Sequence, residues 1–420
     1  MGKDASFSWF YPSVGTLDRI WPSGAHRRGL HGQSCDGIFN DKPFPVGNEA
    51  GVNYPHPLVS VLVPVFNAGE YVMAAVRSIL LQSYDNFELL LLDDGSTDGT
   101  SELVRDAACL DSRVKVSLRP RLGITPSLNE LISQAQGEFI ARLDADDIAY
   151  PERLRSQVEY LGRKSEVGVV SCWTHQVTED GASITCLCYP DDSQWIHRQL
   201  ETGRNPIIHS SVMLRIDVLR NMEGPYRTRY LQDLDLWLRL LPVTKFGIVP
   251  ELLIASRQHP GSLSSTNTKN RLRLHDFIME LHRRRCRGLN DDGWYEVEQE
   301  LLARASPTTS EDKKTATRHY LAGLASQMNN VDREVTRSYF RRAVRERTLF
   351  PKAILRYLLT FLPDQLSDRL LAINYLRKRR YGPLPEYFRR LDDVLSSEQR
   401  THFEEFWREV NKPPELEGSG

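Results

Sequence analysis

Short apolar runs alternate with stretches of helical periodicity between residues 58 and 143. Continuous apolar runs are typical of strands buried on both faces of a sheet. They lie at 59–65, 87–92, 114–118 and 139–143. Between them, apolar residues recur at the spacing of one helix face. The first such stripe is Val72, Val76, Ile79 and Leu80. This regular alternation of strand and helix predicts a doubly wound α/β sheet.

Polar residues follow each of these predicted strands directly. They are Asn67 and Glu70, then Asp93 and Asp94, then Arg119 and Arg121, then the aspartates of 144–147. Parallel sheets bind their ligands at the carboxyl ends of the strands. We therefore expect these side chains to gather at one edge of the sheet and to form a single binding site there.

The pattern after residue 143 is mixed, and after about residue 270 it becomes helical and rich in arginine. Further strands are predicted at 167–172, 183–188, 211–215 and 245–249, and a short helix at 234–241. Residues 1–56 are rich in Gly, Pro, Ser and Asn and show no periodicity. The chain is thus expected to comprise an extension that is loosely ordered or docked through its aromatic residues (1–56), an α/β domain (57–265) and a helical region (266–420).

Composition narrows the class of protein. The net charge of −1 over 420 residues gives no reason to expect a nucleic-acid partner. The six cysteines are scattered, which argues against a disulfide framework and for a reducing compartment. We see neither a secretory signal nor an apolar stretch of the roughly 18 residues that a membrane span needs. The expectation is a cytoplasmic protein, soluble or peripheral at the inner membrane face.

Asp144, Asp146 and Asp147 are the strongest chemical signal in the sequence. Carboxylates this close together repel one another unless a counter-charge is present. A divalent cation would relieve the repulsion while bridging to diphosphate oxygens, and hard oxygen ligands suit Mg²⁺ or Mn²⁺. The alternative is a solvated acidic turn in which Asp147 caps the helix near Pro151. The position directly after a buried strand favours the metal.

Two further acidic segments are candidates. Asp93 and Asp94 end a strand ahead of a Gly/Ser/Thr/Asp turn, where they could accept hydrogen bonds from a base N–H. No GxGxxG motif accompanies them, so a dinucleotide fingerprint is absent. Asp233 and Asp235 open the helix at 234–241, where the macrodipole keeps a carboxylate ionised. An ionised carboxylate at this place either stabilises the start of the helix or acts as a general base.

Basic residues near these acids have two interpretations each. Arg142 is a structural counter-ion of the acidic cluster or a phosphate contact, and we favour the structural role. His209 is either a packed structural histidine or part of the site. Arg257 and His259 lie in one predicted loop, where they could bind phosphate or ligate the metal.

Taken together, these segments resemble those of family 2 glycosyltransferases with the GT-A fold. The matching segments are Val61–Asn67, Ser78–Tyr84, Asp93–Asp98, Gly137–Asp147 and Pro151–Leu154. Their order and spacing over roughly 58–260 make the resemblance specific. It implies a GT-A type doubly wound mixed sheet, and transfer of a sugar from a nucleotide donor, usually UDP-linked, with inversion at the anomeric carbon.

The resemblance also implies roles for individual residues on the donor side. The backbone near Pro64 and Phe66 would line the nucleotide pocket, Asp94 would face the base, and Arg121 would contact the donor. Asp144 and Asp146 would serve the ribose, the diphosphate and the metal.

Other implied roles concern the metal and the acceptor. Asp147 and His259 would be further metal ligands, with Arg257 and His259 in a loop that closes over the donor. Asp233 matches the base that deprotonates the acceptor hydroxyl, although Gln232 stands where the family usually has Glu.

The C-terminal region lies outside the resemblance. Residues 320–353 loosely resemble one tetratricopeptide-like helix pair, which would have to pack on a neighbour. Residues 341–380 carry eleven Lys/Arg against three acids, with apolar residues interleaved. Such a segment either covers the catalytic domain with a solvated basic face, which we favour, or lies on an anionic membrane surface.

The sequence therefore predicts a glycosyltransferase that moves a hexosyl or N-acetylhexosaminyl group, depends on Mn²⁺ or Mg²⁺, and acts on a glycan or lipid-linked acceptor in polysaccharide biosynthesis. Two other classes remain open. A nucleotidyltransferase should carry a basic, glycine-rich loop after its first strand, and 65–69 has no basic residue. A catalytically silent GT-A-like binding module would not need both the acidic cluster and Asp233.

Overall fold

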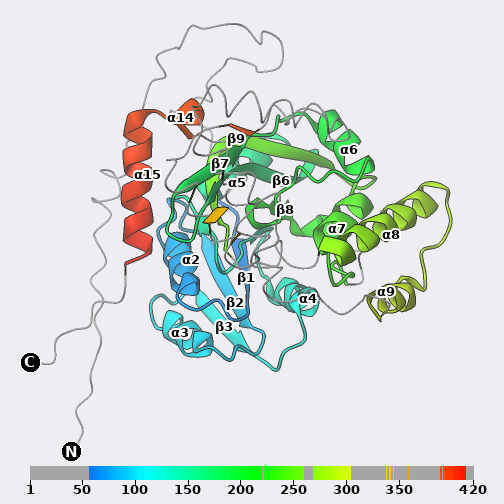
Figure 1. Cartoon of the computed structure of the whole chain (residues 1–420), viewed down its shortest axis with the longest axis horizontal. Coiled ribbons are helices and arrows are strands. Elements are labelled where there is room, and N and C mark those ends of the chain that lie inside the picture. The colour runs from blue at the N-terminus through cyan, green and yellow to red at the C-terminus, as the bar shows by residue number, and fades with distance from the viewer. Residues whose placement is uncertain are drawn as a thin grey trace, which may run out of the picture.

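The computed structural model describes residues 56–219, 222, 224–259, 268–303 and 391–412, with isolated positions between 337 and 389. Figure 1 shows a central sheet flanked by helices. Residues 1–55 of the predicted extension, the tetratricopeptide-like pair and almost all of the basic segment 341–380 lie outside the described residues.

The first half of the domain is a parallel sheet with the strand order β3-β2-β1-β4. Its elements are β1 (Val59–Val65), α2 (Tyr71–Leu80), β2 (Phe87–Asp93), α3 (Thr100–Ala107), β3 (Val114–Leu118), α4 (Ile124–Gln134) and β4 (Phe139–Arg142). Strands β1 and β2 are buried along nearly their whole length. The strands and helices predicted from periodicity are thus confirmed over this half.

The second half extends the sheet in mixed orientation. β8 pairs antiparallel with both β4 and β6, β7 continues antiparallel from β6, and β9 runs parallel to β6. The elements are β5 (Ile148–Ala149), α5 (Arg153–Arg163), β6 (Val167–Val177), β7 (Ser183–Leu187), α6 (Ser193–Glu201), η2 (His209–Ser211), β8 (Met213–Arg215), η3 (Ile216–Leu219), α7 (Gln232–Leu240) and β9 (Lys245–Arg257). The predicted GT-A type mixed sheet is confirmed.

The structure differs from the sequence prediction at the ends of two strands. β6 and β9 each continue well beyond their apolar starts, because each pairs with the other along its length. Arg257 therefore ends a strand and does not lie in a loop. The two-residue strands β5 and β10 (Phe388–Arg389) were not predicted, since so short a segment has no readable periodicity. β10 adds a strand from the C-terminal region to the edge of β7.

The C-terminal region contributes helices on two sides of the sheet. α8 (Thr268–Cys286) lies beside α7, and α9 (Trp294–Ala303) lies beside α8. On the opposite side, α15 (Ser397–Val410) lies next to α2, and α14 (Leu391–Val394) lies near β7 (Figure 1). A Ser396–Gln399 capping box begins α15. The buried face of α15 packs on β6, β7 and β9. Among the described residues no helix is both long enough and apolar enough to span a bilayer.

Candidate active site

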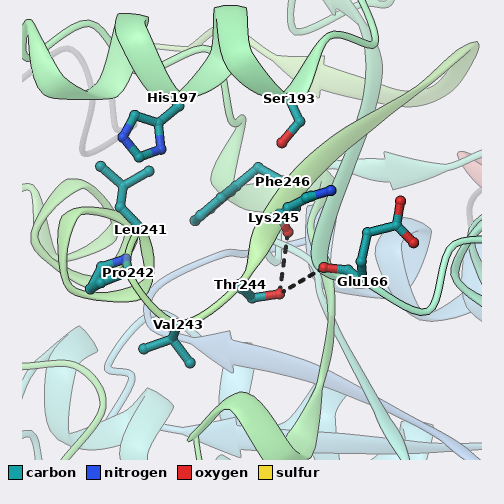
Figure 2. Close-up of a pocket in the computed structure, with 9 residues that line it drawn as sticks. All are labelled: Glu166, Ser193, His197, Leu241, Pro242, Val243, Thr244, Lys245 and Phe246. Carbon is teal, nitrogen blue, oxygen red and sulfur yellow. Dashed lines mark hydrogen bonds between the residues drawn. The ribbon is translucent and has the colours of Figure 1, made fainter.

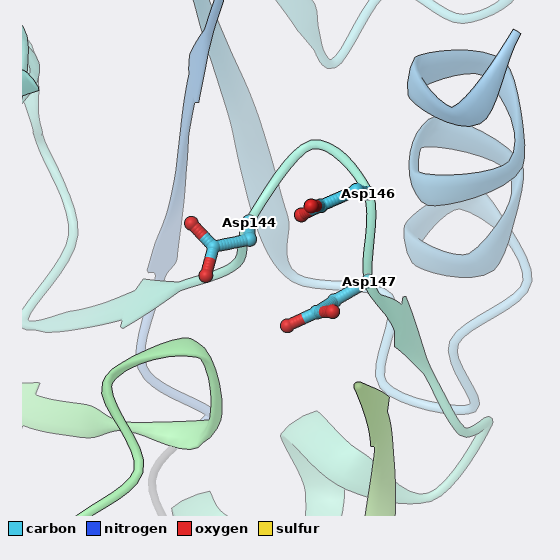
Figure 3. Close-up of side chains that lie close together, drawn as sticks. All are labelled: Asp144, Asp146 and Asp147. Carbon is cyan, nitrogen blue, oxygen red and sulfur yellow. The ribbon is translucent and has the colours of Figure 1, made fainter. Parts of the chain in front are cut away.

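The acidic cluster forms a loop between β4 and β5. One ligand atom from each of Asp144, Asp146 and Asp147 lies within 4.8 Å of the others. Asp146 and Asp147 both point toward the side of the loop that carries Asp144 (Figure 3). The loop is short because β4 ends at Arg142 and β5 begins at Ile148. The sequence spacing thus brings all three carboxylates together, as expected.

Each carboxylate of the cluster has a nitrogen partner. Asp144 accepts both terminal nitrogens of the buried Arg142. Asp146 Oδ2 lies 2.7 Å from His259 Nε2. Asp147 Oδ1 accepts the backbone N–H of Arg257 at 2.9 Å. Arg142 is therefore a counter-ion within the cluster, as favoured from the sequence, and His259 lies directly beside Asp146.

Burial and the neighbouring carboxylates raise the pKa values of two carboxyls of the cluster, Asp144 and Asp147. Burial raises the pKa of Asp147 well above its usual range, and the neighbouring Asp146 and Asp144 raise it further. Burial also raises the pKa of Asp144, against the opposing effect of Arg142. Three converging carboxylates beside an imidazole fit a hard divalent cation.

The alternative role of Asp147 as a helix cap does not match the structure. The residue at the N-cap of α5 is Glu152, and no side chain caps that helix. Asp147 is 3% exposed and is held instead by Arg257 at the end of β9. Its carboxylate faces the other two acids.

Gln82 and Arg153, which lie in two of the segments that carry the family resemblance, connect the elements on either side of the acidic cluster. The side chain of Gln82 donates to the Tyr150 carbonyl at 2.8 Å and accepts from Leu154 N–H at 3.0 Å. Arg153 is fully buried and donates to the Arg142 carbonyl at 2.6 Å. Both side chains tie α5 and the strand ends together. They are structural parts of the site and do not reach toward its open side.

Asp94 is more constrained than the sequence suggested. Its oxygens accept the backbone N–H groups of Leu122 at 2.9 Å and Gly123 at 2.7 Å, and Arg119 lies 3.1 Å away. It is 4% exposed. The carboxylate therefore pins the loop between β3 and α4 against the end of β2, and this is the contact the structure assigns to it.

That pinned loop brings two predicted donor contacts together. The Arg121 guanidinium lies over the Phe66 ring, with its carbon 3.7 Å from the ring centroid. The close approach depends on Gly95, where φ is +76° and a Cβ would lie 2.8 Å from Arg121 N. Pro64 and Phe66 are both half-buried at the end of β1. A flat cationic and aromatic surface thus lies at the carboxyl edge of the sheet.

The two aspartates of the first turn of α7 have different environments. Asp235 is fully buried and ion-paired to Arg227 at 3.1 Å and Arg239 at 3.0 Å. Asp233 accepts the side-chain amide of Asn205 at 2.8 Å. Its charge is one of the causes that raise the pKa of Asp144. Asp233 is thus a half-buried carboxylate held by Asn205, while Asp235 belongs to the packing of the helix.

His209 belongs to the core beside the site. Its Nε2 lies 2.8 Å from the Tyr226 hydroxyl, and its ring packs against Tyr226 and Trp237. Burial, together with the nearby Arg142, lowers the pKa of His209 well below its usual value. The imidazole is neutral and packed, as expected of a structural histidine.

Several residues of the site could not be found from the sequence. Asn205 contacts Asp233, Ser210 accepts the Asp144 N–H at 3.1 Å, and Tyr71 lies beside the His259 ring. None belongs to a motif: Asn205 and Ser210 come from the second half of the domain, and Tyr71 of α2 is recognisable only through its contact with His259. The single signal was the polar 204–205 pair ahead of Pro206 and an apolar run.

A separate pocket lies far from this site. Its volume is about 310 Å³, and its lining includes Glu166, His197 and Lys245 (Figure 2). Lys245 begins β9, whereas the acidic cluster contacts Arg257 at the other end of that strand. The pocket is therefore unrelated to the acidic cluster.

Comparisons with known proteins point to one family of enzymes. The family model described as "Glycosyl transferase family 2" matches residues 60–217. The chain is 35% identical over 188 residues to "Putative glycosyltransferase EpsE" of Bacillus subtilis, covering 44% of this chain and 66% of that protein. It is 32% identical over 218 residues to "Putative teichuronic acid biosynthesis glycosyltransferase TuaG" of the same organism, covering 51% and 84%.

The match to EpsE spans about two thirds of that relative's length. Among solved structures, S. aureus TarS 1–349 in complex with UDP-GlcNAc is 16% identical with a TM-score of 0.46. That comparison covers 72% of this chain and 90% of the TarS chain.

Proposed function

The chain belongs to glycosyl transferase family 2 and is a glycosyltransferase, and from that premise we propose that it is a metal-dependent, inverting enzyme. The donor is a nucleotide-linked sugar, UDP-linked as the family resemblance implies. The acceptor is a hydroxyl of a glycan or a lipid-linked saccharide. The observation that supports this most directly is the acidic cluster itself, in which Asp144, Asp146 and Asp147 each place a ligand atom within 4.8 Å of the others.

The acidic cluster is the proposed diphosphate end of the site. Asp146, with Asp147 and His259 beside it, would hold Mn²⁺ or Mg²⁺. Such an ion neutralises charge on the departing diphosphate when bound. Asp144 is fixed by Arg142 and is placed to accept ribose or metal-bound groups. Phe66 and Arg121 form the proposed nucleotide surface, with Pro64 behind them and Asp94 holding the loop.

Asp233 is the proposed general base. Its oxygen takes the proton of the acceptor hydroxyl while the acceptor oxygen bonds to the anomeric carbon and the bond to the diphosphate breaks. Attack from the face opposite the diphosphate inverts that carbon. Asn205 holds the carboxylate, and the N-terminal end of α7 favours its ionised form.

The transferred group is proposed to be a hexose or an N-acetylhexosamine, and the place of action the cytoplasm or its inner membrane face. The polysaccharide role is supported by the printed name of one relative, which concerns teichuronic acid biosynthesis. Membrane contact through 341–380 is part of the same proposal and falls outside the described residues, apart from isolated positions.

The test is a screen of nucleotide-sugars for Mn²⁺-dependent binding and hydrolysis, with two variants beside the parent. Asp146→Ala should weaken metal-dependent donor binding about tenfold or more, because a ligand is lost. Asp233→Asn should bind the donor normally and transfer at least about 100-fold more slowly, the usual contribution of a general base. Glu166→Ala, in the distant pocket, removes a carboxylate without touching the site and should match the parent.

Two results would contradict the proposal. Full transfer by Asp233→Asn would remove the base assignment while leaving the donor site intact. Binding that needs no metal, or that Asp146→Ala leaves unchanged, would remove the metal site.

A further inference from the structure

Arg257 connects the acidic cluster to a distant part of the chain. Its backbone N–H holds the Asp147 carboxylate, and its side-chain Nε donates to the Asp146 carbonyl at 3.1 Å. It also donates to the Glu179 carbonyl in the turn between β6 and β7. One residue therefore fixes the position of both Asp146 and Asp147.

The C-terminal end of α15, together with Tyr71 of α2, supplies the remaining partners of that guanidinium. Asn411 Oδ1, at the C-terminal end of α15, accepts from Arg257 Nη2 at 3.0 Å. The guanidinium carbon lies 4.5 Å from the centroid of the Trp407 ring and 4.5 Å from that of Tyr71. Asn411 is itself oriented, because its Nδ2 donates to the Trp407 carbonyl at 2.8 Å and leaves the oxygen for Arg257.

This end of α15 is held firmly on the catalytic domain. Gly181 has φ +90°, and a Cβ there would lie 2.3 Å from Trp407 Nε1, so the turn between β6 and β7 makes room for the indole. Arg77 of α2 donates to the Val410 and Lys412 carbonyls at the end of the helix. Phe403, one helix turn earlier, packs against the rings of Tyr150 and His175.

The partners matter because a buried guanidinium needs them. Arg257 is only 3% exposed, so its charge depends on partners within the protein. The carboxylates of Asp147, Asp146 and Glu179 also act on this guanidinium through their charge. A guanidinium bound to Asp146 or Asp147 would occupy the oxygens that a divalent cation requires.

We propose that Trp407 and Asn411 are positioning residues for the metal site, holding Arg257 on the backbone of the acidic loop and away from its carboxylates. This inference rests on the proposed metal site. It assigns a role in donor binding to a helix that lies outside the segment matching the family model.

The experiment measures the dissociation constant of Mn²⁺ by the EPR signal of the free ion, with the full-length chain, alone and with UDP or GDP present. Trp407→Ala and Asn411→Ala should each raise the dissociation constant of Mn²⁺ about tenfold. This is the usual effect of removing a residue that helps to orient the metal ligands. Trp407→Phe keeps an aromatic face for the guanidinium and should stay near the parent value.

Phe403→Ala is the matched control, since it removes an equally buried ring of α15 that packs elsewhere. It should lower the Tm as much as Trp407→Ala does, yet leave Mn²⁺ binding unchanged. Equal loss of Mn²⁺ binding in Phe403→Ala and Trp407→Ala would show a general effect of helix docking and overturn the inference, as would unchanged binding in Asn411→Ala. If Asp146→Ala binds Mn²⁺ as tightly as the parent does, the result would instead reject the metal site itself.

Discussion

The side-chain amide of Asn205 donates to the Asp233 carboxylate, with 2.8 Å between Nδ2 and Oδ2. The amide oxygen of Asn205 accepts the backbone N–H of Ile207 at 3.1 Å, which fixes which end of the amide faces Asp233. A residue 28 positions earlier thus supplies a direct support for the proposed base, at a helix start where Gln232 replaces the usual Glu.

We predict that Asn205→Ala lowers kcat about tenfold and leaves donor binding unchanged, because a hydrogen bond to the ionised base is worth about 1.5 kcal/mol or more. The acidic limb of the pH–rate profile should move to higher pH, since the charged form of the base loses support. Arg198→Ala, an exposed change on α6, is the control. An unshifted profile with normal kcat would show that Asn205 serves the loop only.

The stacked pair of Phe66 and Arg121 predicts a contribution to nucleotide affinity. Arg121→Ala should weaken UDP binding about two- to fivefold, the size of an exposed cation–π contact. Arg121→Lys keeps the charge but not the flat guanidinium, so it should recover only part of the loss. Titration calorimetry measures both constants, with the exposed Arg105→Ala as control. Equal affinity in the parent and Arg121→Ala would remove this surface from the donor site.

The ion pairs of Asp235 predict a large effect on stability. Asp235→Ala leaves Arg227 and Arg239 without their buried partner, and breaking a buried pair in this way costs about 3–5 kcal/mol of unfolding free energy. Urea denaturation measures the loss. The exposed Asp217→Ala should cost no more than about 0.5 kcal/mol. If Asp235→Ala lowered the free energy of unfolding by no more than Asp217→Ala does, water would have to reach Arg227 and Arg239.

His175 predicts a pH dependence of stability. Burial lowers the pKa of this imidazole to about 3, and it lies between Ser183, Tyr150 and Phe403. The unfolded chain has a histidine pKa near 6.5, so between these values the folded state binds fewer protons and loses stability as pH falls.

The slope attributable to His175 approaches about 1.4 kcal/mol per pH unit inside that window. The free energy of unfolding of the parent relative to His175→Gln should therefore fall between pH 6.5 and pH 4. His402→Gln, on the half-exposed side of α15, should not change the slope. A constant difference between parent and His175→Gln across this range would show that the imidazole takes up a proton without unfolding.

The sequence predicted the first half of the sheet well because its signals are local. A strand such as 59–65 carries its burial in its own apolar run, and Asp144 to Asp147 follow a strand directly. The position of Arg142 just before the acidic cluster likewise favoured its role as a counter-ion. It could not distinguish Asp233 from Asp235, since both lie in one helix turn and only the arginines of other segments decide between them.

Long-range pairing explains what the sequence did not show. Arg257 was placed in a loop because the apolar start of β9 ends early, whereas pairing with β6 carries the strand to Arg257 itself. The contact of Asp94 with a nucleotide base stays a prediction, and the sequence did not show that its oxygens also accept N–H groups of a loop 28 residues away. Trp407 and Asn411 had no motif at all, and only tertiary contact reveals them.

The distance along the chain between Arg257 and Asn411 also sets an order of events during synthesis. The two residues are 154 positions apart, and at a translation rate of about 5–20 residues per second the ribosome needs roughly eight to thirty seconds to cover that interval. The sheet and its acidic loop are then already outside, while Arg257 still lacks two partners. A chain truncated before Trp407 and the full-length chain should therefore differ in Mn²⁺ binding, since the proposed donor site gains these two partners of Arg257 only after α15 has been made.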